Sequence, residues 1–248
     1  MDLPRSFTIR ESSHRIINPL TPEKLATLGA AIRLRPGVSV VDLCCGKGEM
    51  LATWARDHGV TGTGVDISTV FLSAARERVA ELGVADRVTF VHGDASTYVA
   101  AQPADVAACI GATWIGQGTA GTVTLLERSV RPGGMLLVGE CFWRAEPPGQ
   151  EAIEGCHARS RDDFETLPGL VRLFDGLGYD LVEMVLADED SWDRYVAAQW
   201  MNVRTWLDAH PDDELAPEFR AELSREPLLY TAYQRRLLGW GVFALKRR

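Results

Sequence analysis

The sequence predicts an α/β fold in which a mostly parallel, doubly wound sheet is covered by helices on both faces. Short β-branched or apolar runs alternate with helix-like segments through residue 139, and the links between them are short. A glycine turn follows the first predicted strand, and an aspartate stands at or just after the end of each of the first three. In such a sheet the carboxyl ends of the strands share one edge, where small ligands bind.

The stretch 38–51 carries the strongest local signal. It begins with a β-branched run at 38–41, continues with Asp42, and then enters a turn that contains Gly46 and Gly48. An apolar-periodic segment follows and predicts a helix. A strand that passes through a glycine turn into a helix presents free backbone N–H groups to a ligand.

The turn lacks the spacing of a dinucleotide-binding fingerprint. That fingerprint needs a third small residue three positions after Gly48, where this chain has Leu51. An acidic residue at Asp42 would repel a pyrophosphate, whereas it suits a ligand that carries an ammonium group. A nucleotide-dependent oxidoreductase is therefore the weaker alternative for this turn.

The remaining elements follow in order along the chain. Thr21-Pro22-Glu23 has the hydroxyl cap, first-turn proline and early acid of a helix start, and Ser68 can cap a second helix. We expect a single domain, 1–248, with an N-terminal arm and helix at 1–36 and a helical insertion at 188–236 over the substrate side. Further strands are predicted at 61–67, 87–91, 105–110, 135–139, 179–186 and 239–245, with helices at 70–82, 122–130, 170–177 and 190–210.

Three aspartates come at the ends of successive predicted strands, and we interpret them together. Asp66 can accept hydrogen bonds from both ribose hydroxyls of an adenosyl group that has no 2′-phosphate. Asp94 and the N–H of Ala95 can pair with the edge of an adenine. A single strand-end acid is commonly a turn or cap residue, but Asp42, Asp66 and Asp94 in register favour a shared ligand.

These motifs resemble those of the class I S-adenosylmethionine (SAM) methyltransferases. In residues 107–115 and in its tail the chain is similar to the small stand-alone bacterial enzymes of the YjhP type. The resemblance implies a Rossmann-like, seven-stranded sheet whose last strand is antiparallel. It also implies SAM as methyl donor and S-adenosylhomocysteine (SAH) as product. The residues that carry the resemblance are 41–48, 64–68, 93–95, 107–115, 131–134, 178–184 and 239–245.

The resemblance also implies where each part of the cofactor lies. The turn after Asp42 would hold the methionyl part, Asp66 the ribose, and Asp94 with Ala95 the adenine. Ile110 and Gly111, at the end of the fourth predicted strand, would border the reactive sulfonium. Cys44 stands where the family usually has its first glycine, and a cysteine favours ordinary backbone angles. The implied cofactor-binding residues are Asp42, Cys44, Gly46, Gly48, Asp66, Ile67, Asp94, Ala95, Ile110 and Gly111.

Two side chains are candidates for acid–base work. Methyl transfer from a sulfonium depends mainly on positioning, and it needs a base only when the nucleophile carries a proton of high pKa. Glu140, just after the fifth predicted strand, is the first candidate, with capping or ion pairing as the alternative. His14, on the arm, is the second, with simple solvation as the alternative.

Aromatic residues supply the candidates for acceptor binding. Trp114 and Trp143 follow the fourth and fifth predicted strands and can wall an acceptor site. Trp192, Tyr195 and Trp200 recur at helical spacing. The spacing is typical of a stripe that faces the core, and the alternative is that part of the stripe covers the substrate.

The cysteines suggest a third possibility. Cys44, Cys109 and Cys141 each fall at or just past the end of a strand, and converging sulfurs can bind a soft metalloid, as in arsenite methylation. Alternate strand residues face opposite sides of a sheet, which argues against such convergence. We expect no metal site, and five cysteines, two of them adjacent, do not form a disulfide framework.

Composition limits the class of partner. A net charge of −8 argues against a broad nucleic-acid surface. No apolar run is long enough to span a membrane, and the first residues lack the apolar core of a signal peptide. We expect a cytoplasmic enzyme, monomeric or homodimeric, that acts on a small molecule. A SAM-binding regulator or partner subunit without turnover is the alternative.

Overall fold

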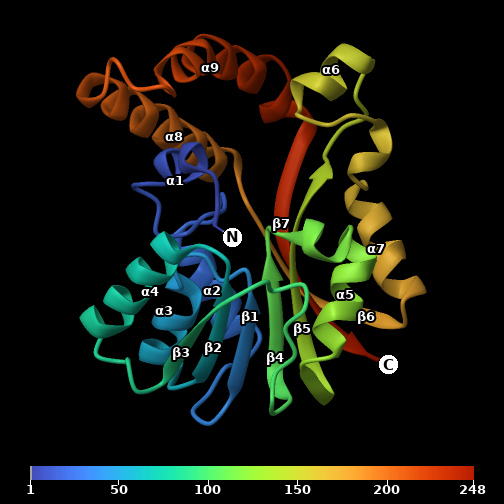
Figure 1. The fold of residues 1–248 in the computed structure, drawn as a ribbon. Helices are drawn as coiled ribbons and strands as arrows, with labels where there is room; N and C mark the ends of the chain where they lie inside the picture. The colour runs from blue at the N-terminus through green and yellow to red at the C-terminus, as the bar shows by residue number, and fades with distance from the viewer. Residues whose placement is uncertain (1) are drawn as a thin grey trace.

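The computed structural model describes residues 2–248 and contains a seven-stranded sheet in the order β3-β2-β1-β4-β5-β7-β6 (Figure 1). Parallel pairing joins β3, β2, β1, β4 and β5, whereas β7 is antiparallel to both β5 and β6. This topology confirms the Rossmann-like fold and its antiparallel last strand. The strands are β1 (Ser39–Leu43), β2 (Thr61–Asp66), β3 (Val88–His92), β4 (Ala104–Ile110), β5 (Val130–Trp143), β6 (Tyr179–Leu186) and β7 (Leu238–Arg247).

Helices connect the strands, and two of the predicted helix caps are formed. The Thr21 hydroxyl accepts from the N–H of Lys24, and the Ser68 hydroxyl accepts from the N–H of Phe71, both at 3.3 Å. The helices are α1 (Arg5–Arg10), α2 (Pro22–Ala31), α3 (Glu49–His58), α4 (Thr69–Glu81), the 3₁₀ turn η1 (Thr113–Gly116), α5 (Thr119–Glu127), α6 (Gln150–Gly155), the 3₁₀ turn η2 (Arg161–Asp163), α7 (Leu167–Gly176), α8 (Glu189–Ala209), α9 (Ala216–Leu229), the π-helix η3 (Tyr230–Gln234) and α10 (Arg235–Leu237).

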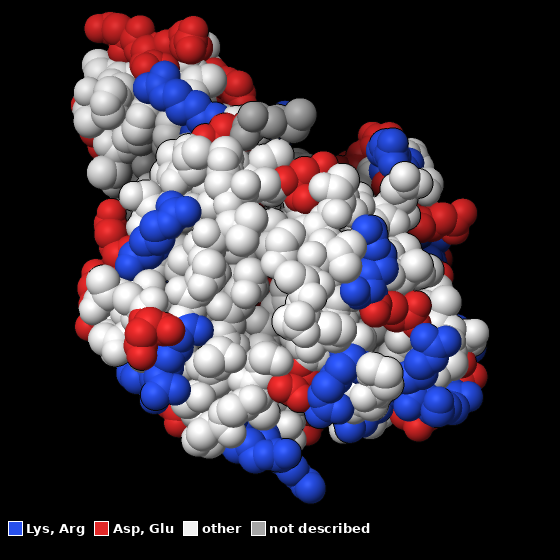
Figure 2. Space-filling view, turned by 60° about the horizontal axis from the view of Figure 1, so that its bottom comes forward, with Lys and Arg blue, Asp and Glu red and all other residues white. Residues whose placement is uncertain are grey.

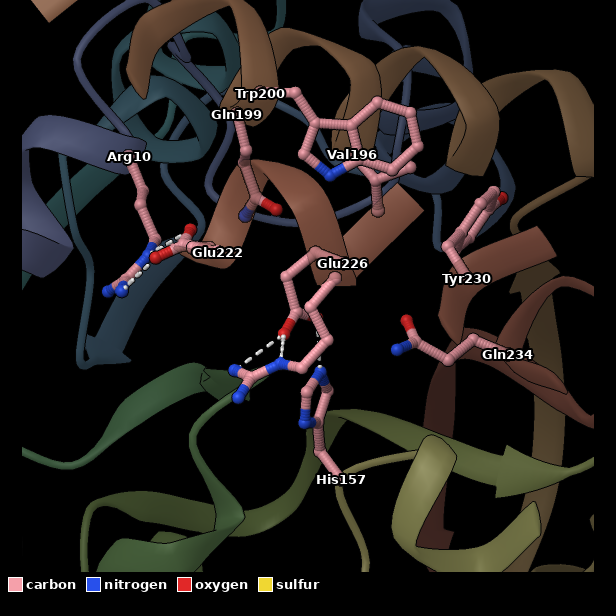
Figure 3. Close-up of a pocket in the computed structure, with 10 residues that line it drawn as sticks. Arg10, His157, Val196, Gln199, Trp200, Glu222, Glu226, Tyr230 and Gln234 are labelled. Atoms are coloured by element: carbon pink, nitrogen blue, oxygen red, sulfur yellow. Dashed lines mark hydrogen bonds and ion pairs between the residues drawn. The ribbon is translucent and has the colours of Figure 1, made fainter. Parts of the chain in front are cut away.

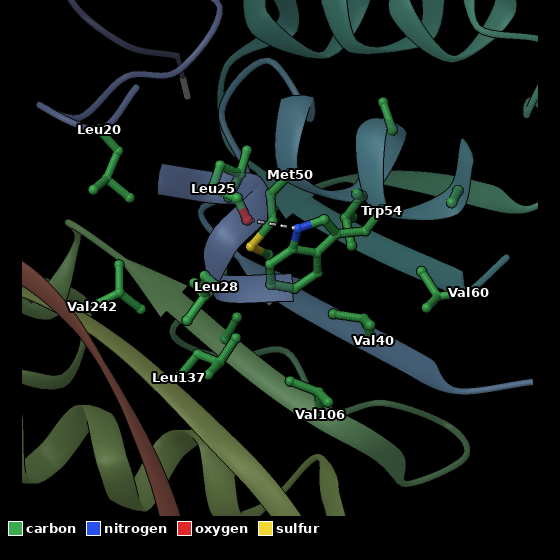
Figure 4. Packing of buried hydrophobic residues seen from close by; sticks show 14 of the residues in the cluster. Leu20, Leu25, Leu28, Val40, Met50, Trp54, Val60, Val106, Leu137 and Val242 are labelled. Carbon is green, nitrogen blue, oxygen red and sulfur yellow. Dashed lines mark hydrogen bonds between the residues drawn. The ribbon is translucent and has the colours of Figure 1, made fainter. Parts of the chain in front are cut away.

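Each face of the sheet buries its own apolar layer. On one face α2 and α3 pack against β1 and β4, around Trp54, which is 1% exposed (Figure 4). The indole N–H of Trp54 donates to the main-chain oxygen of Leu25 at 3.2 Å, so this large side chain is buried with its one polar group satisfied. On the other face α5 and α7 pack against β4, β5 and β7, with Leu126 and Phe174 at 0% exposure.

The segment between β6 and β7 forms a helical layer outside the sheet. Helices α8 and α9 pack on each other around Val203, Leu207 and Phe219. Figure 1 shows this pair, together with α1, beyond the carboxyl ends of β1 and β4. The layer therefore covers the edge of the sheet where the three strand-end aspartates were predicted to meet.

Strand β5 is longer than the sequence analysis predicted. It runs from Val130 to Trp143, so it begins before and ends after the predicted strand at 135–139. The extension is stabilised by antiparallel pairing with β7, in which Glu140 lies opposite Gly241 and Trp143 opposite Leu238. Glu140 and Trp143 are therefore strand residues, whereas the sequence predicted that they follow the strand.

Candidate cofactor and acceptor site

Asp66, at the end of β2, ties the glycine turn to the start of α4. One carboxylate oxygen accepts from the N–H of Gly46 and the other from the N–H of Ser68, each at 2.8 Å. The side chain is 5% exposed, and burial raises its pKa while these backbone bonds lower it. Each oxygen keeps a free lone pair, so Asp66 still has capacity for the two hydroxyls of a ribose.

The glycine turn depends on left-handed backbone angles at three positions. The φ angles of Cys44, Gly46 and Gly48 are +63°, +54° and +67°. The expectation that Cys44 takes ordinary angles is therefore wrong: it adopts the conformation of the glycine that it replaces. A Cβ atom on Gly48 would lie 2.7 Å from Cζ of Phe90, so this position tolerates no side chain.

Asp42, at the end of β1, is a buried carboxylate without a hydrogen-bond partner among residues 2–248. It is 4% exposed, and its Oδ1 atom makes no hydrogen bond. Burial, and then the charge of Asp66, raise its pKa well above the usual range. An unpartnered buried carboxylate suits a cationic ligand, so the site fits the ammonium group of the methionyl part of SAM.

The two other parts of the predicted cofactor crevice are more open. Asp94 is exposed, and its Oδ1 accepts from the hydroxyl and N–H of Ser96 at 2.7 and 2.9 Å, which lowers its pKa. Ala95 beside it is buried. At the end of β4, the amide of Asn18 donates to the main-chain oxygen of Ile110 at 3.3 Å, and Gly111 has a φ of +80°.

The arm crosses this crevice as a strap, residues 11–18. Nζ of Lys47, in the glycine turn, donates to the main-chain oxygen of Glu11 at 2.7 Å. Ile17 packs on the same turn, since a Cβ atom on Gly46 would lie 3.1 Å from its Cδ1. With Asn18 at the end of β4, the strap is fixed on both sides of the place where the resemblance puts the sulfonium.

A buried polar cluster joins the strap to α8. The carboxylate of Glu11 is 1% exposed and accepts from the hydroxyl of Tyr195 at 3.0 Å and the amide of Gln199 at 2.7 Å. Nδ1 of His14 lies 2.9 Å from the other carboxylate oxygen, at an angle that does not form a hydrogen bond. The imidazole also packs on the Tyr195 ring, with 4.5 Å between centroids. The candidate His14 is thus held beside an acid rather than solvated.

A cavity of about 290 Å³ lies next to this cluster, between α8, α9 and the segment after α6 (Figure 3). Gln199 belongs to both, because it bonds Glu11 and lines the cavity. Trp200 and Tyr230 form an edge-to-face wall with 5.9 Å between centroids. The lining residues are Arg10, His157, Val196, Gln199, Trp200, Glu222, Arg225, Glu226, Tyr230 and Gln234.

Ion pairs fix the charged part of this lining. The guanidinium of Arg10 bonds both oxygens of Glu222, at 2.7 and 2.5 Å, and this carboxylate raises the Arg10 pKa. Nε2 of His157 lies 2.7 Å from the carboxylate of Glu226. The cavity wall therefore offers apolar ring faces and polar groups whose charges are already balanced.

The other sequence candidates lie elsewhere. Glu140 accepts from the Thr119 hydroxyl and from the N–H of Cys141, both at 2.8 Å, and so holds the start of α5. Trp143 is 1% exposed and packs on Phe164, so it is an interior residue. Trp192 packs between two apolar clusters, whereas Trp114 on η1 is 70% exposed.

The three cysteines do not converge. Cys44 and Cys109 both pack in the layer under α5 and α7, and their interaction, together with burial, raises the pKa of the Cys109 thiol. In β5, Val138 is the strand partner of Cys109, so the two side chains lie on the same face of the sheet. Cys141 comes three residues after Val138, and because successive strand residues alternate between faces, it packs against clusters on the opposite side. Within residues 2–248 no group of three or more His, Cys, Asp or Glu side chains could hold a metal ion. The metalloid alternative therefore has no structural support.

Some residues of the candidate site were not predicted at all. Three of them are single polar residues in segments without periodicity: Glu11, Asn18 and Lys47. Gln199 lies in a helix in which only the aromatic residues indicated a role in acceptor binding. Only the position of Lys47, inside the glycine turn, could have drawn attention to it. The others meet through contacts between residues far apart in the chain.

The doubly wound sheet with an antiparallel seventh strand, the glycine turn after β1 and the carboxylate that ends β2 define the class I SAM-dependent methyltransferases. In agreement, residues 40–134 match the family described as methyltransferase domain. None of the helices described within 2–248 has the length and apolar character needed to cross a membrane.

Over its whole length the chain is 57% identical to YjhP of Escherichia coli (strain K12), and the match covers 100% of both chains. Two solved SAM-dependent methyltransferases in complex with SAH are equally similar. The one from Geobacter sulfurreducens is 62% identical, with a TM-score of 0.98 over 100% of this chain and 99% of the other. The one from Thiobacillus denitrificans is 58% identical, also with a TM-score of 0.98, over 100% of both chains. The chain belongs to the class I SAM-dependent methyltransferases, in the group that includes YjhP.

Proposed function

We propose that this methyltransferase transfers the methyl group of SAM to a small-molecule acceptor bound in the cavity between α8, α9 and the segment after α6. The observation that carries the proposal is the cavity itself. Its volume of about 290 Å³ is at the lower end of the range for small-ligand sites, and it adjoins the strap through Gln199. A compact acceptor can therefore reach toward the cofactor crevice from this side.

The lining favours an acceptor that is partly planar and partly polar. Trp200 and Tyr230 present ring faces and edges, which stack well on a planar group. Arg10, Arg225 and His157 each have a carboxylate partner, so the lining has no unpaired charge that would select a strongly ionic acceptor. Trp114, exposed on η1, is not among the residues that line this cavity.

A nucleic-acid acceptor is disfavoured by charge. The chain carries a net charge of −8. On the face of residues 2–248 seen in Figure 2, Lys and Arg lie in small groups separated by acidic and uncharged residues and form no continuous basic patch. Binding to a phosphate backbone needs clustered cations.

For the cofactor we propose the residues of the crevice already described. Asp42 binds the ammonium group, Asp66 the ribose, and Asp94 with Ala95 the adenine. Ile110 and Gly111 lie beside the sulfur, and the remaining contacts come from Ile67, Cys44, Gly46 and Gly48. Because the reaction is an in-line displacement, these residues act chiefly by holding the methyl group in line with the acceptor.

The test is SAH formation by the purified enzyme with SAM and the dialysable metabolite fraction of a bacterial extract. We expect turnover with this fraction and none with the retained macromolecules. Trp200→Ala should raise the amount of extract needed for half-maximal rate about fivefold or more without changing SAH affinity, because about 1 kcal/mol or more of ring contact is lost. Met201→Ala is the matched control, since Met201 follows on α8 and is 64% exposed. Turnover only with the macromolecular fraction would refute the proposal.

A further inference from the structure

Glu11 and His14 contain most of the buried polar side-chain atoms that lack a hydrogen bond within residues 2–248. The unpartnered atoms are Oε2 of Glu11, Nδ1 and Nε2 of His14, and Oδ1 of Asp42. Buried polar groups are normally paired, so each of these needs an explanation. The ammonium group of the cofactor accounts for Asp42, but it does not account for the pair on the strap.

The pair has the arrangement of an acid that orients an imidazole. Oε2 of Glu11 is 2.9 Å from Nδ1 of His14, close enough for a hydrogen bond after a small rotation of the ring. Catalytic hydrogen bonds are often misaligned before the ligands bind. With the Nδ1 proton directed to Glu11, Nε2 would carry the free lone pair.

Glu11 is held firmly enough to act in this way. Its other oxygen accepts from Tyr195 and Gln199, and the main-chain oxygen accepts from Lys47. Burial and the nearby Glu11 carboxylate raise the pKa of the Tyr195 phenol, so Tyr195 remains a donor at neutral pH. Within residues 2–248, no Lys or Arg pairs with the Glu11 carboxylate. The charge is therefore available to stabilise a positive imidazolium.

The place of the pair in the fold connects it to both ligands. The strap is fixed to the glycine turn through Lys47 and to the end of β4 through Asn18, on either side of the proposed sulfonium position. Gln199 connects Glu11 to the acceptor cavity. His14 thus lies on the segment that contacts both the proposed cofactor crevice and, through Glu11 and Gln199, the acceptor cavity.

We propose that Nε2 of His14 accepts the proton of a hydroxyl group on the acceptor as that oxygen is methylated, and that Glu11 is the positioning residue that orients the imidazole; the inference rests on the proposed function. The acceptor oxygen forms a bond to the methyl carbon, and the carbon–sulfur bond breaks with its electron pair remaining on sulfur. SAH, the methyl ether and an imidazolium are the products. A hydroxyl is the acceptor that needs this help, because thiolates and free amines attack without loss of a proton of high pKa.

Kinetics of single and double variants test the roles. With the dialysable extract as acceptor, His14→Gln should lower SAH formation about 100-fold or more, and Glu11→Gln less, while SAH affinity by calorimetry stays within about twofold for both. Because Glu11 acts through His14, Glu11→Gln should have no further effect when His14 is already Gln. His210→Gln is the control, since His210 is exposed at the far end of α8. Equal turnover of His14→Gln and wild type overturns the inference, whereas no turnover by wild type overturns the proposed function.

A second readout does not depend on turnover. The chain has five histidines, so ¹⁵N NMR of the SAH complex can assign His14 by comparison with His14→Gln. We expect the neutral tautomer with the proton on Nδ1, and a mixture of tautomers in Glu11→Gln. A proton on Nε2, or an imidazolium at the pH of maximal turnover, contradicts the role of His14 as base. A tautomer that does not change in Glu11→Gln contradicts the role of Glu11.

Discussion

Nζ of Lys47 donates to the main-chain oxygen of Glu11 at 2.7 Å, which joins the glycine turn to the strap that crosses it. The same ammonium donates to the main-chain oxygen of Ser12 at 3.0 Å and lies 5.6 Å from the centroid of Phe71. Partial burial lowers the pKa of Lys47. The groups that we assign to the cofactor and those that we assign to the acceptor are therefore coupled through a single side chain.

Replacing Lys47 should release the strap. Lys47→Met keeps the length of the side chain but removes two hydrogen bonds to the arm, worth about 1–3 kcal/mol together. Trypsin should then cut at Arg10 and Arg15 about 5- to 100-fold faster, which mass spectrometry of the fragments can follow. Lys246→Met, near the end of β7, is the control. If the arm of Lys47→Met resists trypsin as well as wild type, other contacts suffice to hold it.

We expect the buried carboxylate of Asp42 to lower the stability of the folded chain and to strengthen cofactor binding. Its pKa is higher in the folded than in the unfolded chain, so the folded state loses stability as pH rises from about 4 through the raised pKa. Asp42→Asn should therefore raise the free energy of unfolding near neutral pH by about 1–3 kcal/mol, with little difference at acidic pH where wild type is protonated.

The same substitution should weaken SAH binding about tenfold or more, because the ammonium group loses its anionic partner. Denaturant unfolding at several pH values, with and without SAH, measures both effects. A destabilised Asp42→Asn protein at neutral pH would show that the carboxylate has a partner in solution.

Sequence patterns predicted the fold, and the strand ends that we assign to the cofactor, from features that are local in the chain. Each strand and its following turn form one continuous segment, so Asp42 and Asp66 could be placed at strand ends from the apolar runs before them. The sheet then aligned those ends without further information. Asp66 bonds Gly46 as well as Ser68, which couples two motifs that the sequence shows separately.

The proposed acceptor side is harder to predict from sequence because it depends on distant contacts. Glu11 and Gln199 are 188 residues apart, and neither segment carries a pattern that indicates the other. Glu140 and Trp143 were predicted to follow the fifth strand, which was expected to end at residue 139. Pairing with β7 carries the strand to Trp143 instead.

Asp66 should contribute more to cofactor affinity than Asp94. Asp66→Ala removes a buried carboxylate whose hydrogen bonds to ribose hydroxyls are worth about 1.5–3 kcal/mol each, so SAH affinity should fall at least tenfold. Asp94→Ala, at an exposed position, should cost less. Calorimetry with SAH compares the two, and thermal unfolding monitors the loss of the Gly46 and Ser68 bonds. Equal affinity of Asp66→Ala and wild type would remove Asp66 from the ribose site.

Substitutions of Cys44 test whether the turn needs a small, unbranched residue at this position rather than a thiol. At a φ of +63°, a side chain costs about 1–2 kcal/mol relative to glycine, and branching at Cβ adds to that cost. Cys44→Gly relieves this strain. It also lowers the free energy of unfolding by about 0.5–1 kcal/mol, because glycine gives the unfolded chain more conformational entropy, and it loses packing against Cys109. Its stability should thus stay near that of wild type, whereas Cys44→Val should be destabilised by about 2 kcal/mol. Urea unfolding of the three proteins measures the difference. Equal stability of the Val and Gly variants would mean that residue 44 does not hold a left-handed conformation in solution, and the turn would then have to present its N–H groups to the cofactor in another way.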